Sequence, residues 1–320
     1  MPDRVRLEQG RVRVGERFSV SFQRTLRIPD DGRRYPLPPG LGLFPVRPVA
    51  DYEDRVPAAW RTRGGFFIPM YQREALWLGF DGAEWKPNAV KVGTGGIDAI
   101  SGLAWDAALH DDPQDYLVCP DQPWLDGINA GDGFVRQFVA MPLGSGYTVE
   151  GQVTGEERVG GLELRVFEPK GGRFPDRPPP RPEPGAEMMV LESAAPTGMG
   201  LAAGGRMTQK IYPDPYGLDT WDPATGISVH VHIANSEQYR AITGEPPPPT
   251  PVDARAYTER GLPWFELYDE TRGDLRAAER LRGIRSTGEI DRAGGREEPD
   301  ARPLDVKKGQ IRRGRPRTEN

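Results

Sequence analysis

The sequence predicts a mainly β protein, built as an antiparallel β-sandwich or a barrel-like domain. Short runs of alternating apolar and polar residues recur along the chain, and turn residues separate them. The chain also holds 40 glycines and 34 prolines among its 320 residues. Both residue types weaken helices but suit turns, strand edges and bulges. The composition therefore excludes a coiled coil or a helical bundle, and it predicts loops rich in Pro and Gly.

The first strands are predicted over residues 4–28, where Val, Leu and Phe alternate with Arg, Ser and Gln. This period of two is typical of strands with one buried face, and Gly10 and Gly15 supply the turns. Residues 35–48 are proline-rich and are expected to form an ordered loop or extended chain. Residues 64–80 are the densest apolar stretch, and their aromatic side chains favour strands over a short helix.

Further short strands are predicted over residues 89–100, around a glycine turn, and over residues 115–118 and 134–140. The clearest hairpin pairs residues 147–153 with residues 159–167, because apolar and polar residues alternate in both segments.

Residues 169–187 (PKGGRFPDRPPPRPEPGAE) predict a proline-rich linker, because they carry almost no large apolar side chains. Beyond it, strands are predicted over residues 188–191, 206–212 and 227–233. A single C-terminal helix is predicted over residues 269–281, where Leu275, Ala278 and Leu281 recur at a spacing of three.

From Arg285 onward the chain is polar and charged, which predicts disorder. The predicted organisation is a β-rich domain over 1–168, the linker over 169–187, strands and a helix over 188–284 that pack with the first part, and a disordered tail with a basic end over 285–320.

Several blocks of the sequence carry a resemblance to a known group of proteins. They include YPLPPGLGLFPV (35–46), PMYQREALW (69–77), YLVCPDQPWLDGI (116–128) and RQFVAMPLGSGYTVE (136–150), with further blocks as far as residue 270. In these blocks the chain resembles an uncharacterised protein family of bacteria and fungi. Some fungal members look to carry a ubiquitin-like domain near the position of the 169–187 linker, which implies that the linker tolerates insertions. The resemblance implies no activity and no catalytic residue.

Charge and cysteine content restrict the class of protein. The net charge is −5 with both signs interspersed, which is typical neither of a nucleic-acid-binding globule nor of an acidic solvating chain. The single Cys119 excludes an internal disulfide framework and a cysteine-cluster zinc site. No apolar stretch has the length of a signal-peptide core or a membrane span, so we expect a cytoplasmic protein without a transmembrane helix.

The first candidate site is a divalent metal site formed by His230, His232 and Glu237. Two histidines separated by one residue on a strand point to the same face, as a metal needs from two imidazoles. The spacing resembles the first cupin motif, although the leading glycine is two residues too close and no downstream histidine supplies the second motif. A fourth ligand would be a carboxylate, water, or His110 folding back. The alternative is a histidine pair that faces solvent or a neighbouring strand and binds nothing.

Two further candidates involve the segment around Cys119. Together with His110 it supplies the residue types of a Cys–His nucleophile, although a buried and inert cysteine is the commoner case. The acidic, glycine-rich loop over residues 121–133 offers oxygen ligands for Ca²⁺, but its spacing matches no EF-hand and equally suits a series of turns.

The basic tail and the tryptophans suggest binding rather than chemistry. Arg313, Arg315 and Arg317 lie in an Arg-Gly-Arg-Pro-Arg sequence that matches the core of an AT-hook, which binds the minor groove of A·T-rich DNA. The alternative is a solubilising tail. Trp124 and Trp264 lie beside prolines and are candidates for a ligand groove, whereas core packing is the usual role of tryptophan.

With three histidines and one cysteine, the chain offers few nucleophiles, bases or soft metal ligands. The sequence therefore predicts a non-enzymatic binding or assembly module whose partner is another protein or a second copy of the chain, and which needs no cofactor. The alternative is a cupin-like metal-dependent enzyme that uses His230, His232 and Glu237.

Overall fold

The structure is a computed structural model that describes residues 4–178, 199–249, 253–267, 269, 271–296 and 302–314. Within these residues the chain is mainly β, as predicted: seventeen strands join in one large sheet, and two more form a small separate sheet. The large sheet has two long halves connected by crossing strands.

The first half is an antiparallel ribbon in the order β1–β2–β3–β8. Its strands are β1 (Val5–Glu8), β2 (Arg11–Val14), β3 (Phe18–Thr25) and β8 (Ala75–Asp81), and β5 (Gly40–Leu43) and β12 (Trp124–Leu125) add to its end. The prediction of strands over residues 4–28 is confirmed.

The second half is formed by neighbours in the order β11–β9–β15–β17–β7–β6. They are β11 (Leu117–Cys119), β9 (Asn88–Thr94), β15 (Leu162–Phe167), β17 (Ile227–Ala234), β7 (Phe66–Pro69) and β6 (Arg47–Pro48), and β10 (Ile97–Asp98) turns back on β9. All these pairs are antiparallel except β17 with β7, which run parallel.

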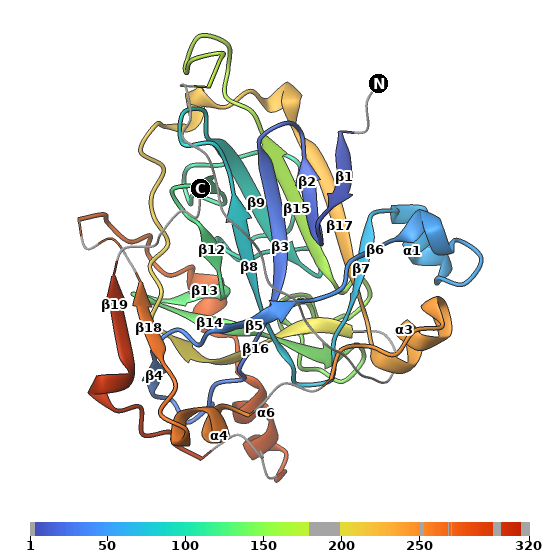
Figure 1. Cartoon of the computed structure of the whole chain (residues 1–320), viewed down its shortest axis with the longest axis vertical. Coiled ribbons are helices and arrows are strands. Elements are labelled where there is room, and N and C mark those ends of the chain that lie inside the picture. The colour runs from blue at the N-terminus through green and yellow to red at the C-terminus, as the bar shows by residue number, and fades with distance from the viewer. Residues whose placement is uncertain are drawn as a thin grey trace.

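The two halves are connected through β14 (Phe134–Pro142) and β16 (Met199–Met207). At one end β14 pairs with β8, and at the other Met199 of β16 pairs with Ile233 of β17. The short strands β13 (Gly127–Gly131) and β4 (Arg34–Tyr35) flank this connection. Figure 1 shows β3, β8, β9 and β15 running along the molecule, with β14 and β16 crossing them lower down.

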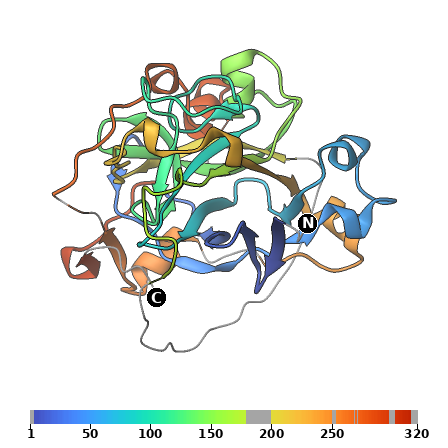
Figure 2. The same cartoon turned by 90° about the horizontal axis from the view of Figure 1, so that it is seen from above.

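In the described part of the chain, six short helices lie outside the large sheet. They are α1 (Ala58–Arg63), α2 (Val149–Thr154), α3 (Ser236–Thr243), α4 (Ala254–Glu259), α5 (Glu279–Arg282) and α6 (Thr287–Ala293), with 3₁₀ turns η1 (Val49–Tyr52), η2 (Leu218–Thr220), η3 (Pro223–Thr225) and η4 (Lys308–Gln310). The small parallel sheet joins β18 (Trp264–Leu267) to β19 (Ile311–Gly314). Figure 2 shows α1 and α3 on one side of the molecule and this small sheet on the other. None of the helices that the structure describes has the length and apolarity of a membrane span.

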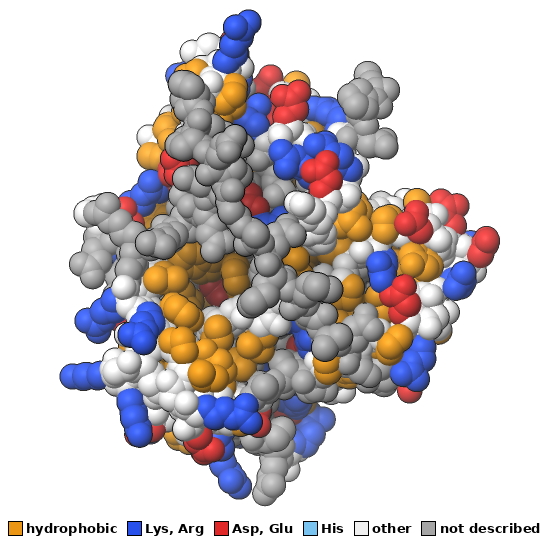
Figure 3. Space-filling model, in the orientation of Figure 1, with side chains coloured by type: hydrophobic (Ala, Val, Ile, Leu, Met, Phe, Trp, Pro, Cys, Tyr) orange, Lys and Arg blue, Asp and Glu red, His pale blue; other side chains and the backbone are white. Residues whose placement is uncertain are grey.

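The main hydrophobic core is formed by side chains from both halves of the sheet. In β3, Phe18, Val20 and Phe22 have no exposed surface, and Val90 and Val92 of β9 and Leu164 of β15 belong to the same cluster. The alternation of apolar residues in these strands therefore predicts the buried face correctly. On the face seen in Figure 3, charged side chains of both signs are interspersed around the rim, and hydrophobic ones gather nearer the middle.

The structure corrects the predicted hairpin in its first arm. Residues 147–153 do not form a strand, because the Thr148 side chain accepts the N–H of Gly151 and caps helix α2, and Gly155 ends that helix with a φ of 81°. The second arm is correct, but β15 pairs with β9 and β17 instead.

The C-terminal region also differs from the prediction. The helix expected over residues 269–281 forms only at its end, as α5. Residues 285–320 are not a disordered tail throughout, because Ser286 and Glu289 form a capping box that starts α6 and because Ile290 and Leu304 are buried. The strand predicted over residues 188–191 and residues 179–187 of the predicted linker lie outside the described residues.

Candidate functional site

The site begins with a polar face on the β9–β15–β17 part of the sheet. Cross-strand partners share a face, and the register aligns Gly93, Glu163 and His230 across these three strands. Two residues along each strand, a second row on the same face aligns Lys91, Arg165 and Ser228. The opposite face of the same strands contributes valines and leucines to the core. The fold therefore collects titratable side chains on one face, although they come from distant parts of the sequence.

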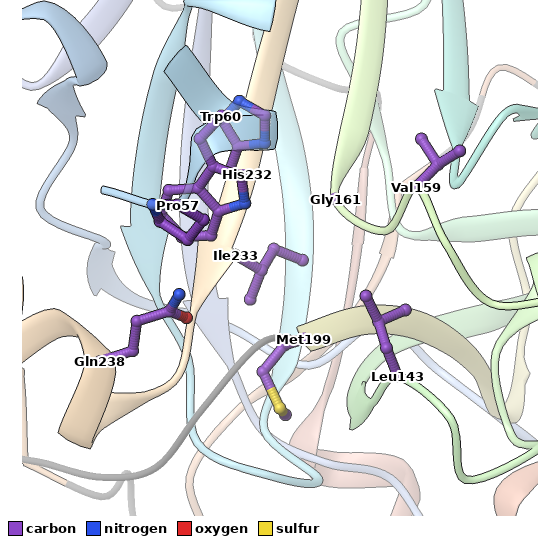
Figure 4. A pocket seen from close by; sticks show the side chains of 9 residues that line it. All are labelled: Pro57, Trp60, Leu143, Val159, Gly161, Met199, His232, Ile233 and Gln238. Atoms are coloured by element: carbon purple, nitrogen blue, oxygen red, sulfur yellow. The ribbon is translucent and has the colours of Figure 1, made fainter. Parts of the chain in front are cut away.

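A pocket of about 130 Å³ lies at the end of this face, where β17 meets α1 and the start of β16. Apolar residues and polar atoms share its lining, which comprises Pro57, Trp60, Leu143, Val159, Gly161, Met199, His232, Ile233 and Gln238. Figure 4 shows Trp60 and His232 on one side of the pocket and Leu143 and Val159 on the other. The His232 imidazole stacks on the Trp60 ring, with the ring centroids 4.8 Å apart and the planes inclined by 11°.

The pocket carries no positive charge from His232 near neutral pH. Burial lowers the pKa of His232 to about 4, and the neighbouring His230 and Arg63 lower it further against the opposing effect of the Gly64 carbonyl. The neutral ring fits a proton on Nε2, which lies 3.0 Å from the Gly64 carbonyl oxygen and donates to it. Nδ1 then remains a hydrogen-bond acceptor.

Glu163 lies beside His230 and is almost completely buried. Burial raises the pKa of Glu163 to about 7, and the nearby Glu150 carboxylate raises it further. Glu150 itself accepts three backbone N–H groups from residues 158–160 at 2.7–2.9 Å, which fixes its position. Glu163 receives only one such bond, from Gly96 at 3.3 Å. Two neighbouring carboxylates thus differ in their bonding, and the raised pKa of Glu163 allows this side chain to exchange a proton near neutral pH.

The predicted metal ligands do not converge. His230 and His232 lie on β17 with one residue between them, as expected, but the exposed Glu237 lies in the first turn of α3. Among the described residues, the possible metal-ligand atoms that do lie within 4.8 Å of one another belong to Asp106, His110 and Asp115. His110 therefore does not fold back onto the other two histidines as a fourth ligand there, but joins its own acidic cluster.

Lys91 already pairs with both carboxylates of that cluster. Its buried ammonium donates to Asp115 at 2.7 Å, to Asp106 at 2.9 Å and to the Ala108 carbonyl at 2.6 Å. The Oδ1 atom of the buried Asp115 accepts the backbone N–H of His110. The Nδ1 atom of His110 lies 2.7 Å from Oδ2, the Asp115 oxygen that also accepts from Lys91. Because the ammonium uses all three of its donors, a metal ion at this group would compete with Lys91 for the same oxygens.

Cys119 has the environment of a structural thiol. It is fully buried, its Sγ donates to the Gln122 carbonyl, and burial raises its pKa well above the usual range. Three residues of the calcium candidate are engaged elsewhere, whereas the fourth, Asp126, is buried and its Oδ2 has no hydrogen-bond partner. Asp121 pairs with Arg272, Asp132 pairs with Arg282, and the Asn129 amide donates to backbone carbonyls.

Of the two tryptophans predicted to line a ligand groove, Trp264 is corrected by the structure. Trp264 is completely buried, and its Nε1 donates to the Thr258 hydroxyl, so it cannot line an open surface. Trp124 is partly exposed on β12 and packs against the main core. In the tail, Arg313 lies in β19 and pairs with Glu266 at 2.7 Å, while Arg315 and Arg317 lie outside the described residues.

Comparison of the chain with protein-family models, with curated proteins and with solved structures finds no match. The resemblance in the sequence blocks therefore stays a prediction, and the functional argument depends on the geometry of the chain itself.

Proposed function

We propose that this chain is a binding protein that takes one apolar side chain of a protein partner into the Trp60–His232 pocket. The observation that carries the proposal is the combination of size and lining. The volume of about 130 Å³ is close to that of an apolar protein cavity that binds benzene, about 150 Å³. One Leu, Met or Phe side chain is of this size.

The chemistry of the walls supports the same occupant. Leu143, Val159 and Met199 offer apolar contacts, and the Trp60 ring, stacked on His232, forms the opposite wall. Since His232 is uncharged at neutral pH, an apolar group meets no buried cation on entering. Interfaces commonly gain most of their affinity from one such anchor side chain in a desolvated pocket.

The state of the reactive groups supports binding over catalysis. The thiol of Cys119 is buried and protonated, and His110 is held in the Lys91 cluster. Nucleophilic catalysis needs an activated nucleophile within reach of a base, and neither residue meets that condition. A cytoplasmic location belongs to this proposal, because Cys119 is a free and buried thiol.

The test uses single amino acid amides as probes. N-acetyl-leucine amide and N-acetyl-phenylalanine amide, titrated into the full chain by NMR, should give saturable shifts, while N-acetyl-aspartate amide should not. Val159→Phe fills the pocket and should weaken binding at least about tenfold, since it removes the contact area of the anchor. Val153→Phe, on α2 outside the lining, is the matched control and should bind as the wild type does. Absence of saturation by either apolar probe, or equal binding by Val159→Phe, would overturn the proposal.

A metal-dependent enzyme is the second candidate, and the Asp106–His110–Asp115 group is the observation that favours it. Purified protein is analysed for Zn, Fe and Mn before and after incubation with each ion. Stoichiometric metal that is lost in His110→Ala supports this site, whereas loss in a His230→Ala/His232→Ala double variant supports the cupin-like site. Protein that takes up none of the three ions excludes both.

A further inference from the structure

A row of three arginines crosses neighbouring strands on a different part of the molecule. Arg34 of β4 pairs in register with Arg206 of β16, and Arg206 pairs in register with Arg136 of β14. Such partners share one face of the sheet, with Cβ atoms about 5 Å apart. Like charges directly opposite each other destabilise a sheet, so the row calls for a compensating anion.

An aromatic ring supports two of these arginines. The guanidinium carbon of Arg34 lies 4.5 Å from the centroid of the Phe134 ring, and that of Arg206 lies 5.4 Å from it. The ring itself lies directly over Gly131, where a Cβ atom would stand 1.7 Å from it. Gly131 thus allows Phe134 to lie against the backbone and to hold two cationic groups side by side.

Protein anions compensate this row only in part. Arg136 pairs with Glu289 at 3.1 Å, yet its Nη1 is buried without a hydrogen-bond partner, and its side chain is only 6% exposed. The Nε of Arg206 is also buried without a partner. Among the residues that the structure describes, neither Arg34 nor Arg206 forms an ion pair, and Arg206 reaches only the Gly32 carbonyl, at 3.4 Å.

Two further carboxylates among the described residues, on segments next to this row, are bonded elsewhere. Asp274 accepts the backbone N–H groups of Gly133 and Ile211, both at 2.8 Å. Asp132 pairs with Arg282. A buried guanidinium N–H without a partner loses its hydration without replacement, and an external anion would supply the missing acceptor.

We propose that Arg34, Arg206 and Arg136 bind a phosphate group of a small ligand, with Phe134 as their support. A phosphate offers several oxygens in the geometry that guanidinium forks bind bidentately. This site goes beyond the proposed binding function, because none of its residues lines the Trp60–His232 pocket.

The experiment titrates the full chain with inorganic phosphate, O-phosphoserine and acetate by isothermal calorimetry, at a constant ionic strength of about 0.15 M so that screening is equal. We expect saturable binding of both phosphate compounds. Arg34→Gln and Arg206→Gln should each weaken it about tenfold or more, the size of a lost charge-assisted hydrogen bond. Arg33→Gln is the matched control, because this neighbouring side chain is 64% exposed and lies within 3.5 Å of Asp31.

Arg34 is exposed, so its substitution leaves the fold intact even where Arg206→Gln is less stable. Circular dichroism and thermal unfolding of each variant establish that it is folded. Absence of saturable binding of both phosphate compounds, an equal loss in Arg33→Gln, or acetate binding as tight as that of the phosphate compounds would each overturn the proposal. Binding of O-phosphoserine but not of inorganic phosphate supports a phosphate monoester as the ligand.

Discussion

Asp98 provides a test of how this fold holds buried charge. The side chain is buried, and its Oδ1 accepts the backbone N–H groups of Ile100 and Ser101 and the Ser101 hydroxyl. Its Oδ2 is buried without a partner. Burial raises the pKa of Asp98 to about 7, and the nearby Asp115 adds to the rise while Lys91 opposes it. We therefore expect Asp98 to be protonated in the folded protein below neutral pH.

The sign of the pH effect follows from this raised pKa. In the unfolded chain an aspartate ionises near pH 3.9. Between that pH and 7 the folded protein holds a proton that the unfolded chain has lost, so stability falls as pH rises. Each pH unit in this window changes the free energy of unfolding by about 1.4 kcal/mol. Between pH 5 and pH 8 the expected loss attributable to Asp98 is about 3 kcal/mol.

The perturbation is Asp98→Asn, which keeps the Oδ1 acceptor and removes the titration. Urea unfolding of the wild type and the variant at pH 5 and pH 8 gives the free energies. Relative to the wild type, the variant should gain about 3 kcal/mol on passing from pH 5 to pH 8. Asp126→Asn should show the same sign, because burial also raises the pKa of Asp126 to about 7. The exposed Asp54→Asn is the control and should show no gain. An Asp98→Asn difference that is equal at both pH values would refute the reasoning.

Three further predictions follow from local geometry. Gly65→Ala should lower the free energy of unfolding, measured in urea, by about 3 kcal/mol or more, because φ at Gly65 is 84° and a Cβ would stand 2.2 Å from the His230 carbonyl oxygen. The control is Gly283→Ala, where φ is −80° and an added Cβ would meet no atom within 4 Å, and its free energy of unfolding should change by less than about 0.5 kcal/mol. Cys119 should resist a thiol reagent at pH 8 in native protein and react once per chain in denaturant, since its thiol is buried with a raised pKa; rapid native labelling counted by mass spectrometry would contradict this. Ser286→Ala should cost about 1 kcal/mol by removing the cap of α6 and should speed amide exchange in that helix; unchanged exchange rates would argue against the cap.

Strand periodicity predicted the fold class because both halves of the sheet present one face to a shared core. It failed at residues 147–153, where alternation suits a strand but one side-chain cap and one glycine favour helix α2. Residues 285–296 were missed because their apolar side chains are sparse. The Ser-x-x-Glu sequence of Ser286 and Glu289 is nevertheless a helix-start signal that was present in the sequence.

The candidate site was predictable only along its own strand. The spacing of His230 and His232 correctly placed both on β17. Glu163 joins them through strand pairing, and Trp60 of α1 joins them by stacking on His232. No local pattern in the sequence indicates either contact. Lys91 did leave a signal, because a lysine between Val90 and Val92 in a buried strand needs an anionic partner. A lysine alone does not indicate which carboxylates those are.

The order of strands in the sheet has a consequence for how the chain reaches its native state. β7 pairs with β17 and β4 pairs with β16 in parallel, and the buried N–H of Gly288 donates to Asp30 across 258 positions of the sequence. During synthesis, β4 and β7 leave the ribosome long before their partners exist. Contacts of such separation close large loops and slow folding. The emerging chain therefore carries unpaired strand edges on β4 and β7 until β16 and β17 have been made, and that interval is when it depends most on protection from aggregation.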